Sequence, residues 1–147
     1  MRKTFLMLAS ITLVCACSGP MGPIAGGELE GTPTAWPEDW TFTDAIENVL
    51  LQTNPDDPYS VTVWMVVDDN APYVAAASTD SRWARNMRND SRVVLSVEGM
   101  LYEASAVTVT TRDDIDRVIR AYLDKYEIES TEDFVQEGGV LFRLQQR

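Results

Sequence analysis

Histidine is absent from the 147-residue sequence, and cysteine occurs only twice. The lack of histidine excludes Ser-His-Asp and Cys-His catalysis, and it excludes metal sites built on imidazole. Both cysteines, Cys15 and Cys17, lie near the amino terminus. If the residues before Cys17 are removed as a leader, no thiol pair remains for a disulfide, a zinc site or an iron–sulfur cluster. Any enzymatic chemistry must then come from carboxylates or from a bound cofactor, and we expect no metal.

Basic residues are scarce as well. The chain has 12 Lys and Arg against 23 Asp and Glu, and its net charge of −11 becomes −13 when Arg2 and Lys3 leave with the leader. So acidic a chain repels nucleic acid and anionic lipid, and we expect no nucleic-acid partner. Hydrophobic residues make up 45% and charged residues 24%, which is typical of a globular protein, and the length suits one domain.

The segment 1–17 has the layout of a bacterial export signal. Arg2 and Lys3 precede an apolar run over 5–14, which fits a secretory core of roughly 7–15 residues and is too short to span a bilayer. The run ends at Val14-Cys15-Ala16-Cys17, with small residues before a cysteine. This end resembles the lipobox of bacterial lipoproteins, which implies cleavage before Cys17 and acylation of its thiol, for example with palmitate. An ordinary cleaved leader with an A-x-A-like site is the alternative.

The residues from Ser18 to Pro37 predict a flexible tether, because glycine and proline recur throughout and no hydrophobic periodicity is present. A linker of about twenty such residues reaches roughly 25 Å, and several acyl chains anchor a protein stably where one does not. We therefore expect a signal peptide over 1–16, an acylated tether over 17–40 and a folded domain over 41–147. Resemblance to lipoprotein sorting signals, with Ser18 after the cysteine, implies the outer membrane and its periplasmic face in a Gram-negative host.

The folded part consists mainly of strand patterns. A β-branched, apolar run predicts a central strand at 61–67. The segment 42–53 fits either a helix or a strand, and we favour a strand. Further strands are expected at 73–77, 92–97, 101–110 and 140–144, mostly joined as hairpins.

Two helices are expected between these strands. The first is capped by Ser78, Thr79 or Asp80 and buries Trp83 and Met87. The second follows a capping box formed by Thr111 and Asp114, and its apolar residues at helical spacing, Tyr122 and Tyr126 among them, pack on the sheet. The predicted class is α+β, mainly β: an antiparallel sheet with interposed helices.

The segment 78–92 carries four of the ten basic residues that follow Cys17. On the first helix, Arg82, Arg85, Asn86 and Asn89 are expected on the polar face. Hydroxyl groups and free N–H groups at a helix start, with arginines beside them, suit a phosphate. Alternatively, these arginines only form ion pairs with the abundant surface carboxylates.

Four segments together resemble a known family: PYSVTVW at 58–64, YVA at 73–75, RWARNMRNDSRV at 82–93 and GMLYEA at 99–104. The chain resembles the split β-barrel proteins related to pyridoxamine-phosphate oxidase and the deazaflavin-dependent nitroreductases. The resemblance covers roughly 48–147, and its clearest element is a W-x-x-N helix that leads into a D-x-R-V strand.

This resemblance implies a split antiparallel β-barrel that forms a homodimer, with FMN or a deazaflavin in a groove between subunits. The phosphate candidates are Ser78, Thr79 and Arg82, with Arg85 as a weaker one, and the backbone of Met65 and Val66 would lie near the isoalloxazine ring. The motif residues Trp83 and Asn86 are also expected to serve packing and helix orientation. Such enzymes need no protein nucleophile, because the flavin transfers the hydride.

Three functions are compatible with the sequence. The first is a membrane-tethered oxidoreductase that uses FMN or a deazaflavin. The second is a cofactor-free split barrel that serves as a binding or assembly module in the cell envelope. A hydrolase with paired carboxylates is the third, although no spacing among the 23 acidic residues stands out.

Overall fold

The computed structural model describes residues 18–129 and 134–147. The expected signal peptide and the acylation site Cys17 therefore lie outside the described residues. The elements in chain order are β1 (Thr32–Pro33), a 3-10 turn η1 (Thr41–Thr43), β2 (Asn48–Thr53), β3 (Tyr59–Asp68), β4 (Ala71–Ala76), α1 (Arg82–Asn89), β5 (Arg92–Val97), β6 (Met100–Thr108), α2 (Arg112–Tyr126) and β7 (Val140–Gln146). Neither helix of this described part is long and apolar enough to cross a membrane.

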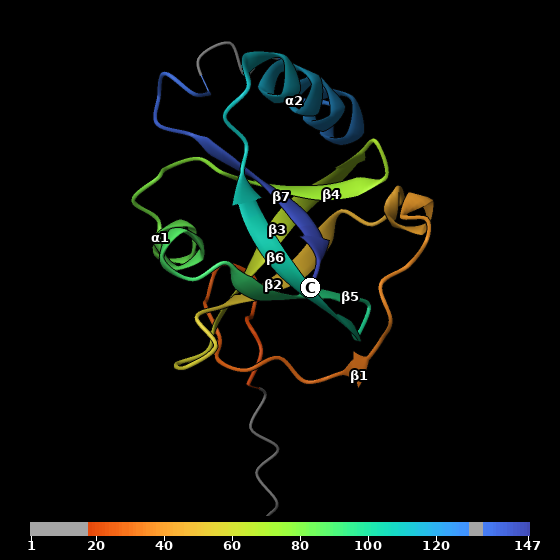
Figure 1. The fold of residues 1–147 in the computed structure, drawn as a ribbon, viewed down its shortest axis with the longest axis vertical. Coiled ribbons are helices and arrows are strands. Elements are labelled where there is room, and N and C mark those ends of the chain that lie inside the picture. Colours follow the sequence, from red (N-terminus) through yellow and green to blue (C-terminus); the bar gives the residue numbers. More distant parts are fainter. Residues whose placement is uncertain (1–17, 130–133) are drawn as a thin grey trace, which may run out of the picture.

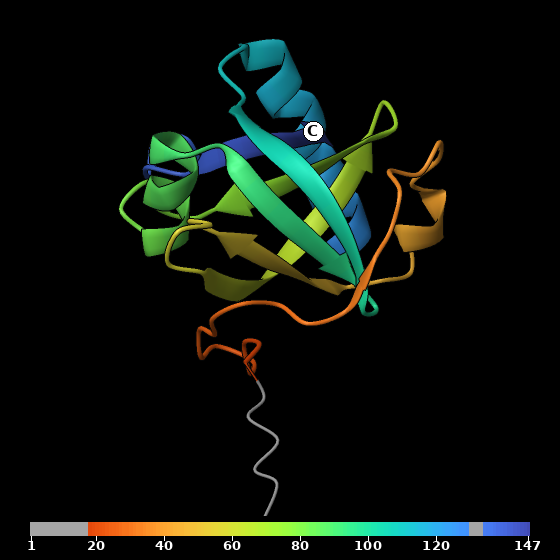
Figure 2. The same ribbon diagram turned by 60° about the horizontal axis from the view of Figure 1, so that its bottom comes forward.

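Strands β2 to β7 close into an antiparallel barrel (Figures 1 and 2). The strand order is β6-β5-β2-β3-β4-β7, and β6 pairs with β7 as well as with β5, which closes the sheet. Two tight turns make the predicted hairpins. Asp69 and Asn70 between β3 and β4, like Glu98 and Gly99 between β5 and β6, all have positive φ, as the twist of two-residue hairpins requires. The predicted fold class is confirmed.

The barrel interior is filled by alternate side chains of the strands. On β3, Val63 and Met65 point inward and join a core that also contains Trp40, Leu95 and Phe142. A second apolar cluster lies outside the barrel, where α2 covers β3 and β4. Figure 1 shows α2 at one end of the barrel and α1 at its side. The positions of the two helices determine which of the predicted site residues lie close to each of them.

Three local predictions were only partly right. The segment 42–53 forms a strand, but only from Asn48, after the η1 turn. Helix α1 starts after Ser81, so Ser78, Thr79 and Asp80 belong to the preceding loop and do not cap the helix. Thr111 is the N-cap of α2, yet its side chain makes no capping hydrogen bond. The helix instead closes through backbone bonds such as Ile115 N–H to the carbonyl of Thr111.

Residues 18–34, called here the N-terminal strap, run along the barrel surface (Figure 2). Gly26 exchanges two backbone hydrogen bonds of 2.9 Å with Ser60 of β3, and the Leu29 N–H donates to the Gln52 side chain of β2 at 2.7 Å. Further along, Thr32 N–H donates to the carbonyl of Gly99 at 2.8 Å. The glycine- and proline-rich pattern indicated a free linker, whereas this described part is packed against the barrel.

Candidate cofactor site

Helix α1 is fixed to the barrel by the motif residue Asn86. Its Nδ2 donates to Thr53 Oγ1 at 2.9 Å, and that hydroxyl donates to the carbonyl of Tyr59 at 3.1 Å. Asn86 therefore faces the β2–β3 hairpin, and its expected place on the polar face was wrong. Ala84 and Met87 are buried and Trp83 is half-buried, so one side of α1 closes the barrel. The W-x-x-N pattern thus serves packing and helix orientation in this chain.

Two arginines of the predicted phosphate segment have carboxylate partners. Arg82 lies 3.6 Å from Asp57 and places its guanidinium 4.3 Å from the centre of the Tyr59 ring. Arg92 forms a bidentate pair with Asp90, with Nε donating to Oδ1 and Nη2 to Oδ2, and it lies 3.9 Å from Asp56. Hydrogen bonding to Arg92 lowers the pKa of Asp90 from 3.8 to about 2. The loop between β2 and β3 thus brings acidic side chains to Arg82 of α1 and to Arg92 at the start of β5.

The loop before α1 is held together by its own hydrogen bonds. The Nη of Arg85 donates to the carbonyl of Asp80 at 2.7 Å, and Arg88 donates to the carbonyl of Thr79. Ser78 Oγ accepts the N–H of Asp80, and the N–H of Thr79 donates to the carbonyl of Gly138 at 2.9 Å. The structure therefore brings the four phosphate candidates into one loop and helix start, where the side chains of Ser78, Arg82 and Arg85 each have a partner within the chain.

The other two predicted cofactor residues lie elsewhere, beneath α2. Met65 and Val66 are 0% and 1% exposed. Strand β2 pairs with β3 only as far as Trp64, so the backbone of Met65 lacks a strand partner on that side. Side chains of α2 fill this place: Met65 N–H donates to Tyr126 Oη at 3.0 Å, and its carbonyl accepts from Lys125 Nζ at 2.9 Å. The backbone of Met65 is therefore engaged by α2, while its side chain joins the buried cluster that also contains Ala84 and Met87 of α1.

A polar cluster on the inner face of α2 holds this helix against strands β3 and β4. Tyr122 Oη lies 3.0 Å from the carbonyl of Tyr73 and 3.1 Å from that of Trp64. Burial raises the pKa of the Tyr122 hydroxyl, and it lowers the pKa of the Lys125 ammonium. The Trp64 ring stacks on Tyr126, with centroids 4.5 Å apart and an interplanar angle of 9°. Helical spacing placed both tyrosines on the packed face of α2, but no sequence signal identified Lys125.

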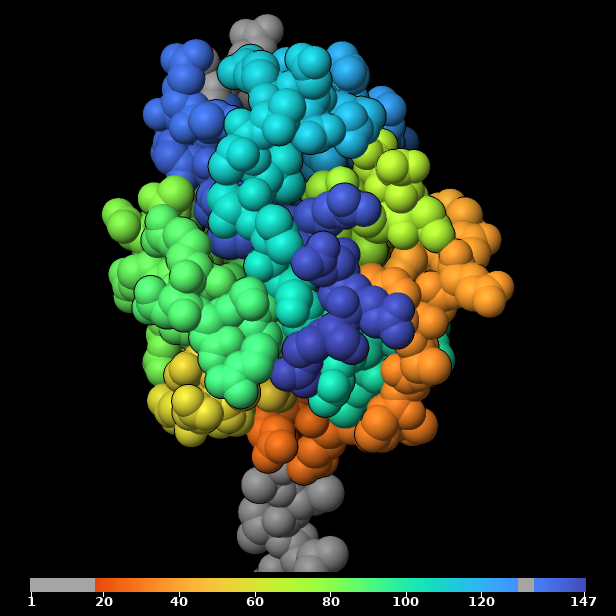
Figure 3. Space-filling view, in the orientation of Figure 1, coloured from red at the N-terminus to blue at the C-terminus, as the bar shows by residue number. Residues whose placement is uncertain are grey.

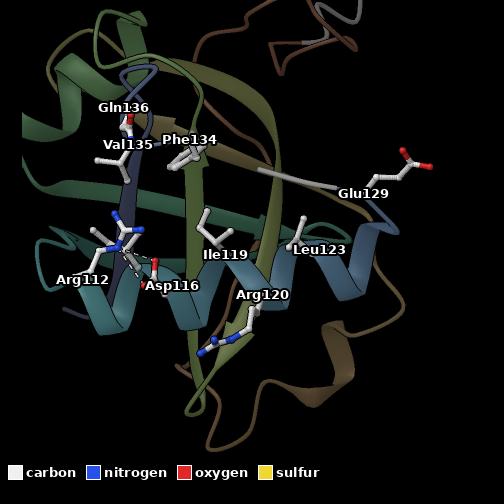
Figure 4. Close-up of a pocket in the computed structure, with 10 residues that line it drawn as sticks. Arg112, Asp116, Ile119, Arg120, Leu123, Glu129, Phe134, Val135 and Gln136 are labelled. Atoms are coloured by element: carbon white, nitrogen blue, oxygen red, sulfur yellow. Dashed lines mark hydrogen bonds and ion pairs between the residues drawn. The ribbon is translucent and has the colours of Figure 1, made fainter. Parts of the chain in front are cut away.

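The cavities of the described part are lined by other residues. One of about 400 Å³ lies between α2 and the segment 134–136, where Ile119 and Leu123 point towards Phe134 and the Arg112–Asp116 pair lies at one end (Figure 4). Another, of about 270 Å³, is enclosed by Gly22–Ala25, Val61, Thr62 and Trp83. Neither is lined by any of the six predicted cofactor residues. Within residues 18–129 and 134–147, no group of three or more acidic side chains is placed to hold a metal ion.

No family model matches the chain, and no curated protein matches it. Solved structures do match. A conserved hypothetical protein from Mycobacterium tuberculosis has a TM-score of 0.59 at 23% identity, with 72% of this chain and 76% of that chain covered.

Two further matches have names that refer to an oxidase or to a flavin cofactor. A putative pyridoxamine 5'-phosphate oxidase from Listeria innocua has a TM-score of 0.54 at 9% identity, over 67% of this chain and 82% of that chain. An FAD-binding protein from Mesorhizobium loti has a TM-score of 0.52 at 18% identity, over 71% and 82%. At these identities the matches show the fold alone, which is a split β-barrel with interposed helices.

Proposed function

We propose that this chain is a lipid-anchored protein of the cell envelope whose split barrel works as a binding or assembly module without a flavin. The observation that carries this proposal is that groups which the family resemblance assigns to the cofactor already have partners within the chain. Arg82 is paired with Asp57, Arg85 with a backbone carbonyl, and the backbone of Met65 with the side chains of α2.

The charges around α1 favour the same conclusion. Asp56, Asp57, Asp80 and Asp90 lie on or beside the segment that holds the four arginines, so the basic residues do not form a focused positive site. A flavin phosphate would have to approach these carboxylates and replace partners that the arginines already have. The negative charges of these carboxylates repel a phosphate. Each charge-assisted hydrogen bond that a phosphate would gain from an arginine contributes about 1.5–3 kcal/mol.

A flavin-dependent oxidoreductase is the second candidate, and one feature of Arg82 favours it. Its 3.6 Å pair with Asp57 is long, and the two side chains are 53% and 81% exposed. Exposed pairs of this kind contribute little, so a phosphate could displace the aspartate. Ser78, Thr79 and Arg82 would then hold the phosphate, a homodimer would complete the groove, and bound flavin would supply hydride transfer. The names of the Listeria and Mesorhizobium proteins agree with this candidate.

An absorbance titration separates the two candidates. The chain from Ser18 to Arg147 is mixed with FMN and, separately, with the deazaflavin. We expect no bound-flavin band at high micromolar concentration. A band with a submicromolar Kd would refute the cofactor-free proposal. In that case Arg82→Ala should weaken binding, whereas Arg120→Ala, which removes an equal charge from the exposed side of α2, should not.

The lipid anchor is tested by labelling with a palmitate analogue in a bacterial host. The wild-type chain should take up the label in the envelope fraction, and Cys17→Ala should take up none. Labelling of Cys17→Ala would show that another residue carries the acyl chain. In a Gram-negative host, we expect the labelled chain at the periplasmic face of the outer membrane.

A further inference from the structure

The N-terminal strap begins with an exposed apolar turn. Met21 and Ile24 exchange backbone hydrogen bonds of 2.9 and 3.0 Å across Gly22 and Pro23, and Gly22 takes a positive φ of 56°. Both Met21 and Ile24 are 66% exposed, more than any other large apolar side chain of the described part. No charged residue lies between positions 18 and 27. An exposed pair of this kind in a neutral segment contrasts with the acidic surface of the rest of the chain.

This turn has a fixed place on the barrel. The N–H of Gly27 donates to the carbonyl of Ser18 at 2.7 Å, which closes the segment 18–27 into a loop. Gly26 then pairs with Ser60 of β3 through two backbone hydrogen bonds. A Cβ at position 26 would lie 2.3 Å from the carbonyl carbon of Gly19, so only glycine permits this approach. The loop is therefore packed onto the barrel and cannot swing away from it without breaking these contacts.

The loop also lies next to the expected acylation site. Ser18 directly follows Cys17, and their Cα atoms are about 3.8 Å apart along the chain. Met21 is four residues from Cys17, a reach of about 14 Å at most. Figures 1 and 2 show the start of the strap at the end of the molecule opposite α2, and Figure 3 shows it at the surface of that end. Acyl chains at Cys17 would thus bring this end of the barrel to the membrane.

We propose that the Met21–Ile24 turn inserts into the lipid interface beside the acylated Cys17, and so holds the barrel in one orientation with α2 directed away from the membrane. The inference rests on the lipid anchor of the proposed function. Apolar side chains of interfacial segments enter about 5–10 Å into the headgroup region, a depth that Met21 and Ile24 can reach. The exposed Glu28 and Glu30 follow the loop and limit the depth, because carboxylates stay in water. The tether therefore acts as an orienting contact and not as a free spacer.

The test uses the acylated full chain in vesicles of phosphatidylethanolamine and phosphatidylglycerol. Processing leaves Cys17 as the only cysteine, and acylation blocks its thiol, so Ile24→Cys introduces a single site for an environment-sensitive dye. Asp113→Cys, at an exposed position in the first turn of α2, is the matched control. We expect the emission of the dye at position 24 to shift to shorter wavelength and to be quenched by spin-labelled lipid. The dye at position 113 should show neither effect.

Two outcomes overturn the inference. If the dye at position 24 behaves like the dye at position 113 in acylated chain bound to vesicles, the turn lies in water or is reserved for a protein partner. If both dyes are quenched equally, the barrel has no fixed orientation. Uptake of the palmitate analogue is measured on the same samples, so a failure of the lipid anchor is recognised separately by the lack of label.

Discussion

Removing the Tyr122 hydroxyl tests how α2 is held on the barrel. Tyr122 is 4% exposed, and its Oη contacts the carbonyls of Tyr73 and Trp64. The substitution Tyr122→Phe keeps the ring but leaves a buried carbonyl without its donor. A buried acceptor that loses its partner costs about 1–3 kcal/mol. We therefore expect the free energy of unfolding at pH 7 to fall by about that amount.

The destabilising effect of the same substitution should shrink at high pH. Burial raises the pKa of Tyr122 above its ordinary 10.0 in the folded chain, while the unfolded chain titrates near that ordinary value. Above pH 10 the unfolded state therefore binds fewer protons than the folded state, and stability falls as pH rises. Tyr122 contributes about 1.4 kcal/mol per pH unit to this fall as long as its folded hydroxyl stays protonated. Because phenylalanine cannot ionise, the gap between wild type and Tyr122→Phe should close at that rate above pH 10.

Urea unfolding of the chain from Ser18 to Arg147, followed by tryptophan fluorescence between pH 7 and pH 12, measures both effects. The control is Val118→Ala, which removes two carbons from the same cluster beneath α2 and no ionisable group. Its cost of about 2 kcal/mol should stay constant with pH. A gap between wild type and Tyr122→Phe that stays equally constant would refute the burial argument for Tyr122.

Three further predictions concern the strap and α1. Gly26→Ala should destabilise the chain and make 18–27 sensitive to protease, because its Cβ meets backbone atoms at 2.3 to 2.6 Å; an equally resistant variant would contradict the packed strap. Asn86→Ala should cost about 1–2 kcal/mol in urea unfolding, since the Thr53 hydroxyl loses its donor, and a neutral result would remove Asn86 from helix docking. Arg92→Ala should raise the pKa of Asp90 from about 2 towards 3.8, as measured by NMR titration of the carboxyl group, and an unchanged pKa would assign the shift to another cause.

The strands and α2 could be predicted from the sequence because their signals are local. The β-branched run of β3 and the turn residues Glu98 and Gly99 identify their elements without knowledge of the rest of the fold. The helix caps were harder to predict than the strands. Several hydroxyl and acidic residues stand in a row before α1, and the backbone conformation alone decides that Ser81 precedes the first helical residue.

The strap was misinterpreted for a physical reason. Glycine and proline give a flexible linker when nothing contacts them, but glycine also permits close backbone approach. Gly26 approaches the backbone of residues 18–20 closely, and Gly31 approaches the backbone of Gly99 closely. Composition cannot distinguish the two uses, because the difference lies in residues far along the chain, such as Ser60 and Gln52.

The candidate site shows the same limit at long range. The sequence identified a cluster of arginines but left open whether it binds an anion or pairs with carboxylates. The answer for Arg82 depends on Asp57, which the β2–β3 loop brings to α1 from 25 residues away, whereas Arg92 has its main partner nearby in Asp90. Likewise, the backbone of Met65 has no partner in β2 because β2 begins at Asn48, and its hydrogen bonds come from a helix that begins far downstream.

The backbone of Met65 provides a last test, because the two candidate functions make opposite demands on it. A flavin ring near Met65 has to displace Tyr126 or Lys125, and α2 would then loosen from β3. Hydrogen exchange of the Met65 amide should therefore change when FMN is added if the ring lies there, and exchange along α2 should increase with it. On the cofactor-free proposal, neither rate changes at an FMN concentration well above micromolar. Flavin binding with both rates unchanged would place the ring away from Met65 and Val66, and would leave the α1 loop as the part of the resemblance that still predicts a site.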